Sequence, residues 1–148
     1  MSDHFATGPH RFSMDGWLCL APFEQMLQME ITEASDGHAT LKMPFLIDLA
    51  QGAGLMHGGA LVSLADTAVA MAIKTLLPPQ SHFATISLES KFLLPVRKGV
   101  VTAKAAIVER DGRIFKGHST ILDDEDRAVM EFTSLFKLAR GVEIAPRA

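Results

Sequence analysis

The sequence predicts an α+β fold in which one long helix is wrapped by a curved antiparallel sheet of five to six strands. Residues 60–77 are almost wholly apolar and carry one acid, Asp66, near their middle. Several segments on both sides of this stretch alternate apolar and polar residues, as half-buried strands do. A helix that is apolar all round needs a partner on nearly every side, and a sheet that curves around it meets this need.

Turn residues divide the chain into short segments. The expected elements are a short helix or turn at residues 20–25, strands at 26–34 and 38–44, a loop at 45–56, the helix at 60–77, and strands at 82–94, 99–110, 113–123 and 128–138. Ser35-Asp36-Gly37 and Asp111-Gly112 are typical of tight hairpin turns. Pro78-Pro79 is expected to end the helix, because proline removes a backbone donor. The last strand alternates most clearly.

Composition indicates one folded domain, with a loose N-terminal arm at residues 1–19, the domain at 20–140 and a C-terminal tail at 141–148. Of the 148 residues 48% are apolar, and the net charge is only -3. Lys and Arg are scattered, which argues against nucleic acid as a partner. Asp66 and Lys74 inside the apolar helix argue against a membrane span. Cys19 is the single cysteine, so we expect no internal disulfide and a cytoplasmic location.

Two features of the apolar helix indicate a catalytic role. A carboxylate such as Asp66 is costly among apolar neighbours unless it is paired or protonated, so we expect its pKa to be raised. Gly58-Gly59, at the start of the helix, leaves backbone N–H groups that can face a ligand. Together they suggest a catalytic element. The histidines show no metal-ligand spacing, and we expect no metal.

The residues around this helix resemble those of the hot-dog-fold acyl-CoA thioesterases, in the branch typified by the phenylacetate-degradation (PaaI-like) enzymes. The resemblance extends from about residue 23 to residue 138. It rests on Gln51 six residues before the histidine of His57-Gly58-Gly59, on Leu64-Ala65-Asp66 nine residues after that histidine, and on residues 87–95, SLESKFLLP.

The resemblance implies a hot-dog fold and hydrolysis of an acyl- or aryl-acyl-CoA to the free acid and CoA, without a cofactor. The Gly58 N–H is expected to stabilise the oxyanion on the thioester oxygen. Asp66 is expected either to attack the acyl carbon or to act as a general base on water, and the sequence leaves both routes open. The other expected catalytic residues are Gln51, His57 and Thr85, and the expected CoA-binding residues are Gly59, Arg97, Lys98 and Arg113.

The spacing within the motif predicts how the chain assembles. Gly58 and Asp66 are eight residues apart, roughly 12 Å along a helix that rises about 1.5 Å per residue. One thioester carbon cannot contact both groups of a single chain, so the acid is expected to come from a second copy. This predicts a homodimer with two composite sites. The resemblance adds that two such dimers often pair into a homotetramer.

One position departs from the pattern, and two other functions stay open. Some relatives carry a threonine one helical turn after the acid, where this chain has Ala70. The alternatives are a non-catalytic acyl-CoA-binding protein and an acyl-thioester hydratase or dehydratase on the same fold. The acyl group is not defined, because the Phe, Leu and Met residues suit aromatic, branched and medium-chain groups alike.

Overall fold

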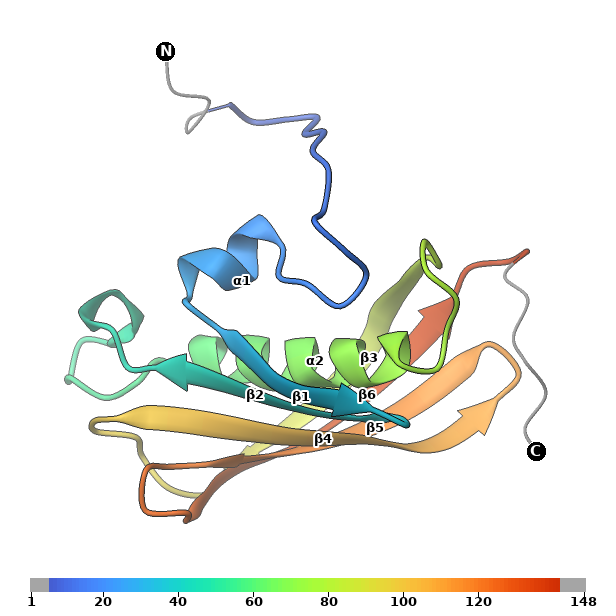
Figure 1. Ribbon diagram of the computed structural model, residues 1–148. Coiled ribbons are helices and arrows are strands. Elements are labelled where there is room, and N and C mark those ends of the chain that lie inside the picture. The colour runs from blue at the N-terminus through green and yellow to red at the C-terminus, as the bar shows by residue number, and fades with distance from the viewer. Residues whose placement is uncertain (1–5, 142–148) are drawn as a thin grey trace.

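A six-stranded antiparallel sheet curves around one long helix (Figure 1). The computed structural model describes residues 6–141. The strand order is β1-β2-β4-β5-β6-β3, so β1 and β3 form the two edges. The elements are α1 (Pro22–Met26), β1 (Glu30–Ser35), β2 (His38–Pro44), the 3-10 helix η2 (Ile47–Leu49), α2 (Gly58–Lys74), β3 (Phe83–Phe92), β4 (Val100–Asp111), β5 (Ile114–Leu122) and β6 (Ala128–Leu138). The predicted fold class is confirmed.

The hairpin turns form at or next to the glycine-containing positions that the sequence predicted. Asp36 and Gly37, with φ of 50° and 77°, connect β1 to β2 at the predicted turn, and two positive φ values are what a type I′ turn requires. The β4–β5 turn lies one residue later than predicted, because Asp111 still pairs with Ile114. β1 begins four residues later than predicted, because Met26 belongs to α1.

Helix α2 ends at Lys74, three residues before its predicted end, and a side chain rather than a proline closes it. The Thr75 hydroxyl donates a 2.6 Å hydrogen bond to the Ala72 carbonyl. The same hydroxyl accepts a 2.8 Å bond from the Gly37 N–H. This pair of bonds ties the end of the helix to the β1–β2 turn.

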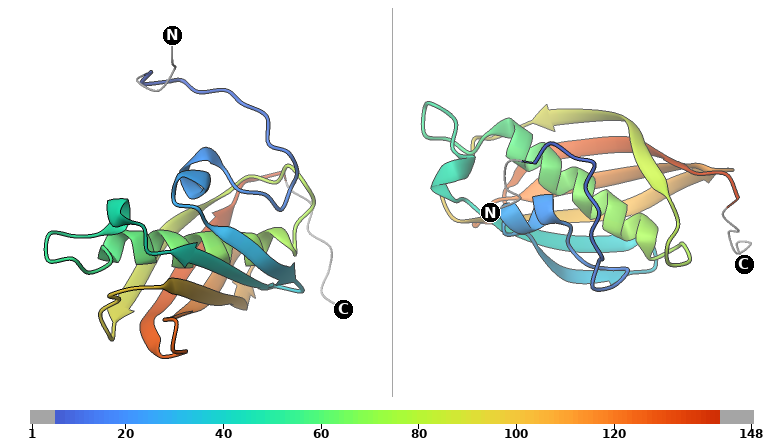
Figure 2. Two further views of the ribbon diagram at one scale, coloured as in Figure 1. Left: turned by 60° about the vertical axis from the view of Figure 1, so that its left-hand side comes forward. Right: turned by 90° about the horizontal axis from the view of Figure 1, so that it is seen from above.

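Only one side of α2 is covered by the sheet, so the prediction of burial on nearly every side is wrong. Leu64, Ala65 and Ala68 face the sheet and are 0% exposed. On the opposite side Asp66 and Ala70 are only half-buried. A single curved sheet covers about half of a helix, and the uncovered half is crossed only in part by the N-terminal segment (Figure 2).

From residue 6 to the start of α1 the N-terminal arm has no helix or strand, but it is fastened at Trp17. The Trp17 indole N–H donates a 2.9 Å bond to the Lys74 carbonyl, and the Lys74 ammonium donates a 3.0 Å bond to the Trp17 carbonyl. The same ammonium lies 4.7 Å from the centre of the indole ring, a cation–π contact. The predicted loose arm is therefore attached to the last turn of α2. Residues 1–5 and all but Gly141 of the predicted tail lie outside the described residues.

Within residues 6–141, no helix combines the length and hydropathy that a membrane-spanning helix requires.

Close approach of α2 to the sheet depends on Gly117 of β5. A Cβ placed on Gly117 would overlap the side chain of Val69, which is 0% exposed. We expect Gly117→Ala to lower the free energy of unfolding by about 1–3 kcal/mol, the usual cost of overpacking a core. Chemical denaturation measures this loss.

Val69→Ala removes the methyl groups that the new Cβ would meet. The double variant should therefore be more stable than the sum of the two single changes predicts, with a coupling of about 1 kcal/mol or more. Strict additivity would show that the Val69–Gly117 contact does not set the distance between helix and sheet.

Candidate active site

The N-terminus of α2 presents one open backbone N–H, that of Gly58. His57 caps the helix, and its Nδ1 accepts a 2.8 Å hydrogen bond from the Gly59 N–H. The His57 carbonyl accepts from the N–H groups of Ala60 and Leu61, at 3.0 and 3.4 Å. Among the residues that the structure describes, no acceptor is bonded to the Gly58 N–H. The expectation that both glycines present free N–H groups therefore holds for Gly58 alone.

This cap also defines the tautomer of the neutral His57 ring. Because Nδ1 of His57 accepts a hydrogen bond, the proton of the neutral ring lies on Nε2. The His57 backbone N–H donates 2.7 Å to the Leu49 carbonyl, which joins the helix start to η2. The contacts of His57 therefore orient the tip of α2.

Gln51 lies beside the open N–H. Gln51 and Gly58 line the same hollow of about 330 Å³, together with Phe92. The Gln51 side-chain oxygen accepts from the Ala53 N–H, which leaves its amide NH₂ as the available donor. A Cβ on Gly58 would lie 3.2 Å from the Phe92 ring, so glycine permits the close fit of ring and helix tip. Sequence reasoning gave Phe92 no role, although it stands within the SLESKFLLP block.

Asp66 lies on the half-buried side of α2 and is held by one side chain of β3. The Thr85 hydroxyl donates to both carboxylate oxygens, at 3.0 and 3.1 Å. Burial raises the pKa of Asp66, and the Thr85 hydrogen bond lowers it in part. The acid is thus oriented, partly desolvated and paired with no cation within the described residues.

Within one chain the predicted catalytic residues form two separate groups. Gln51, His57 and Gly58 gather at the start of α2, while Asp66 and Thr85 lie about two turns further along it, roughly 12 Å at 1.5 Å per residue. The separation that the sequence indicated is therefore present in the folded chain.

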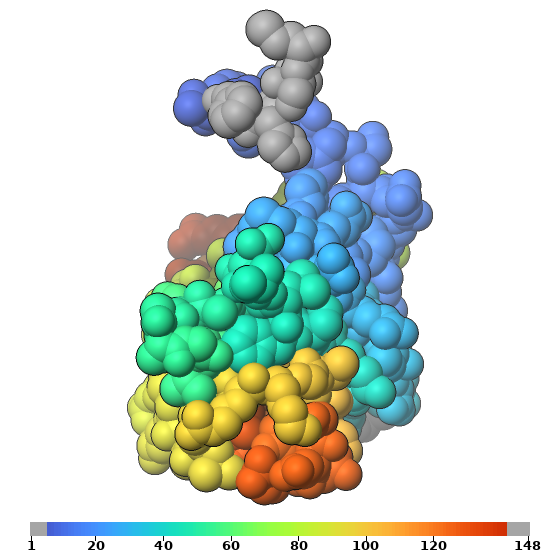
Figure 3. All heavy atoms as spheres, turned by 90° about the vertical axis from the view of Figure 1, so that its left-hand side faces the viewer, coloured from blue at the N-terminus to red at the C-terminus, as the bar shows by residue number. Residues whose placement is uncertain are grey.

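Two of the predicted CoA-binding residues lie at the same end of the molecule as the helix tip. Arg97 and Lys98 follow Val96, whose carbonyl accepts a 2.9 Å bond from the Met56 N–H just before α2. Figure 3 views this end, where the 45–57 loop (green), the 93–99 connection (yellow) and the β5–β6 turn (orange) lie side by side. Both basic residues line a second hollow of about 260 Å³ there.

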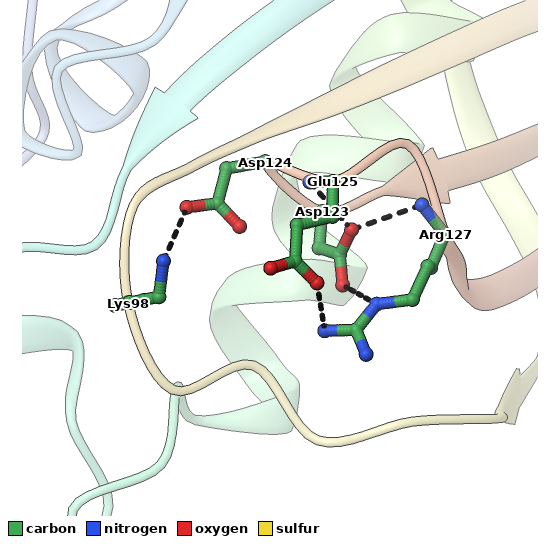
Figure 4. A network of polar contacts seen from close by, with 5 residues as sticks. All are labelled: Lys98, Asp123, Asp124, Glu125 and Arg127. Atoms are coloured by element: carbon green, nitrogen blue, oxygen red, sulfur yellow. Dashed lines mark hydrogen bonds and ion pairs between the residues drawn. The ribbon is translucent and has the colours of Figure 1, made fainter.

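A network of ion pairs at the β5–β6 turn engages Lys98 but not Arg97 (Figure 4). Lys98 pairs with Asp124 at 3.2 Å. Arg127 pairs with Asp123 at 2.9 Å and with Glu125 at 3.0 Å. Backbone N–H donation from Arg127, ahead of other contacts, lowers the pKa of Asp123. Arg97 has no carboxylate partner in the part of the chain that the structure describes, and it is the better candidate for a phosphate.

Arg113 lies elsewhere. It stands in the β4–β5 turn, where its guanidinium donates a 3.2 Å bond to the Leu138 carbonyl. The antiparallel pairing of β4 puts this turn at the opposite end of the sheet from Val100 and the Arg97-Lys98 segment. One chain alone does not bring Arg113 to the helix tip.

Among the described residues, no three His, Cys, Asp or Glu side chains come together as they would around a metal ion.

Comparisons with known proteins identify the family of the chain. The model of the Thioesterase superfamily matches residues 53–130, which include the tip of α2, Asp66 and Thr85. A candidate esterase of Halobacterium salinarum is 31% identical over 114 residues, covering 74% of this chain and 75% of that protein.

Solved structures share the fold. A conserved protein of Pseudomonas aeruginosa superposes with a TM-score of 0.78 at 20% identity, covering 82% of this chain and 97% of the other. A variant of the phenylacetic acid degradation protein PaaI from Thermus thermophilus superposes with a TM-score of 0.73 at 25% identity, covering 79% of this chain and 98% of the other. The chain belongs to the thioesterase superfamily, as a PaaI-like hot-dog protein and a thioester hydrolase.

Proposed function

We propose that the protein hydrolyses the thioester of an acyl- or aryl-acyl-CoA to the free acid and CoA, at sites shared between two copies of the chain. The observation that carries this proposal is the pair of groups on α2. The Gly58 N–H is open at the positive end of the helix dipole, and the Asp66 carboxylate is half-buried and aligned by Thr85. One group suits a developing oxyanion and the other suits attack or proton removal.

The exposed edge of the sheet supports a dimer. Within residues 6–141, β3 is paired only with β6, so its other side has free backbone donors and acceptors. Large apolar side chains on and just after this strand are exposed: Ile86 54%, Leu88 45%, Phe92 56%, Leu93 49% and Leu94 41%. Exposed apolar groups on an unpaired edge favour association with another copy of the same edge.

Antiparallel pairing of two β3 strands would also complete the site. α2 runs antiparallel to β3, since Gly58 lies against Phe92 and Asp66 against Thr85. In an antiparallel pair of identical strands, the residue numbers of any two opposite residues add up to the same value. A two-fold axis between Leu88 and Glu89 therefore places Thr85 of one copy opposite Phe92 of the other. This axis lies near the middle of the strand. Each Asp66 would then face the Gly58 of the second copy.

The proposed reaction uses only groups of the protein and water. The thioester oxygen accepts from the Gly58 N–H, and Arg97 is the base best placed for a CoA phosphate. In one route Asp66 removes a proton from water while the water oxygen bonds to the acyl carbon, and the carbon–sulfur bond then breaks. In the other route Asp66 bonds to the acyl carbon directly, and water hydrolyses the resulting anhydride. In both routes the departing CoA thiolate takes up a proton.

Proline at position 58 removes the Gly58 N–H without breaking the helix. Proline is favoured at the first position of a helix, and His57 before it has φ of -60° and ψ of 132°, which suits a residue that precedes proline. We expect Gly58→Pro to lower kcat by about 10²–10³-fold, the usual loss for one oxyanion donor. Steady-state kinetics with an acyl-CoA substrate measures the loss.

Gly58→Ala is the matched control, because it adds a carbon 3.2 Å from the Phe92 ring but keeps the N–H. It should retain most of the activity. If both variants lost activity equally, packing against Phe92 rather than hydrogen bonding would explain the effect.

The pH dependence of hydrolysis should report on Asp66. Both routes need the carboxylate, so activity should fall as pH drops through the raised pKa of Asp66. Thr85→Val removes the hydrogen bond that lowers this pKa, so the acid limb of kcat/KM should move to higher pH. Thr85→Ser keeps a hydroxyl and should leave the limb near its original position. An acid limb that does not move in Thr85→Val would exclude Asp66 as the titrating group.

A further inference from the structure

We propose that the hollow between the N-terminal arm, the end of α2 and the start of β3 receives the far end of the acyl group, with Trp17 as its end wall. This inference rests on the proposed function, because it extends the same site beyond the carboxylate. We refer to the hollow as the acyl chamber. It has a volume of about 830 Å³, within the range of small-molecule sites. Its apolar lining includes Met14, Trp17, Pro79 and Phe83, and its polar lining includes Lys74, Gln80 and His82.

The acyl chamber lies in line with the Asp66–Thr85 pair. Asp66, Ala70 and Lys74 succeed one another on the half-buried side of α2, and Lys74 lines the chamber. On β3, Phe83 lies two residues before Thr85, and both pair with buried residues of β6, so they face the same side of the sheet. The path from Asp66 to Lys74 covers eight residues of α2, about 12 Å at 1.5 Å per residue.

The surface along this path includes apolar groups from both elements. Ala70 presents a methyl group one turn after Asp66. Phe83 is held against Phe136, with ring centres 5.8 Å apart. Between the carboxylate and Trp17 the path therefore has a methyl group on one side and a fixed ring on the other. Such a path suits an alkyl or aryl group better than a polar one.

Trp17 is held firmly enough to act as a wall. Its indole N–H and its carbonyl are both bonded to Lys74, and the Lys74 ammonium lies over the ring. These contacts use the indole N–H and the carbonyl of Trp17 and place the Lys74 ammonium over one face of the ring, so the rest of the ring remains as an apolar surface. Lys74, to which Trp17 is bonded, lies about 12 Å along α2 from Asp66, so a wall at Trp17 limits the length of an acyl group that starts at the carboxylate. This position of the wall favours a medium-chain or aryl acyl group over a long chain.

Intrinsic fluorescence tests the position of Trp17 without turnover, because it is the single tryptophan of the chain. The full chain is titrated with octyl-CoA, a thioether that cannot be hydrolysed, and separately with CoA. We expect octyl-CoA to change the Trp17 emission and CoA to leave it unchanged. An equal change with CoA alone, or no change with a thioether shown to bind by calorimetry, would overturn the proposal.

Acyl-length preference gives the second test. The ratio of kcat/KM for palmitoyl-CoA to that for octanoyl-CoA is compared in the wild type, Trp17→Ala and Trp17→Phe. Removing the wall should raise the ratio about tenfold or more, while phenylalanine, which keeps a ring, should preserve it. An unchanged ratio in a folded Trp17→Ala protein would overturn the chamber and leave the proposed function intact. Absence of wild-type hydrolysis of every acyl-CoA would instead remove the proposed function, and the fluorescence titration would then decide the chamber alone.

Discussion

The spacing of eight residues from Gly58, with its open N–H, to Asp66, with its carboxylate, is the constraint on which the rest of the structure depends. Both groups lie on one helix that is packed against the sheet through Val69 and Gly117, so no loop movement can bring them together. A reaction centre that uses both must draw them from two helices. The uncovered side of α2, the unpaired edge of β3 and the apolar side chains along that edge are all consistent with this requirement.

The contacts around Gly58 leave one backbone N–H open, and the contacts around Asp66 orient its carboxylate. At the helix tip, the His57 ring and carbonyl accept three of the first four N–H groups and leave that of Gly58. At the other end, burial makes the carboxylate a stronger base and Thr85 fixes its direction. A half-buried acid that is bonded only to a hydroxyl costs stability, and such a cost is common at functional sites.

Sequence patterns predicted the elements well where one physical rule dominates. The alternation in β6 placed Phe132, Ser134 and Phe136 on the buried face, and Gly37 predicted the first hairpin. The end of α2 was missed, since Thr75 caps it through a bond to a turn 38 residues away in sequence. The uncovered side of α2 was also missed, because hydrophobic periodicity cannot separate burial by the chain's own sheet from burial by a second copy.

The candidate site was predictable in its residues but not in their contacts. The residues of the helix drew attention to Gly58 and Asp66, and the resemblance implied roles for Gln51 and His57. The hydrogen bond from the Gly59 N–H to the His57 ring could not be foreseen, because it depends on the rotamer of His57. Arg97 and Lys98 were equivalent in sequence, and only the fold shows that Asp124 pairs with Lys98. Trp17 gave no signal of its own, because its partner Lys74 is 57 residues away.

Complementation between two inactive variants tests the shared site most directly. Asp66→Ala and Gly58→Pro chains are purified, mixed after denaturation and refolded together, and hydrolysis of an acyl-CoA is measured. Each variant alone should have at most about a hundredth of the wild-type activity, while a mixed dimer keeps one intact site made from the Asp66 of one chain and the Gly58 of the other. The account predicts that the mixture regains a substantial fraction of wild-type activity. A mixture of folded, dimeric protein that is no more active than its two components would contradict it.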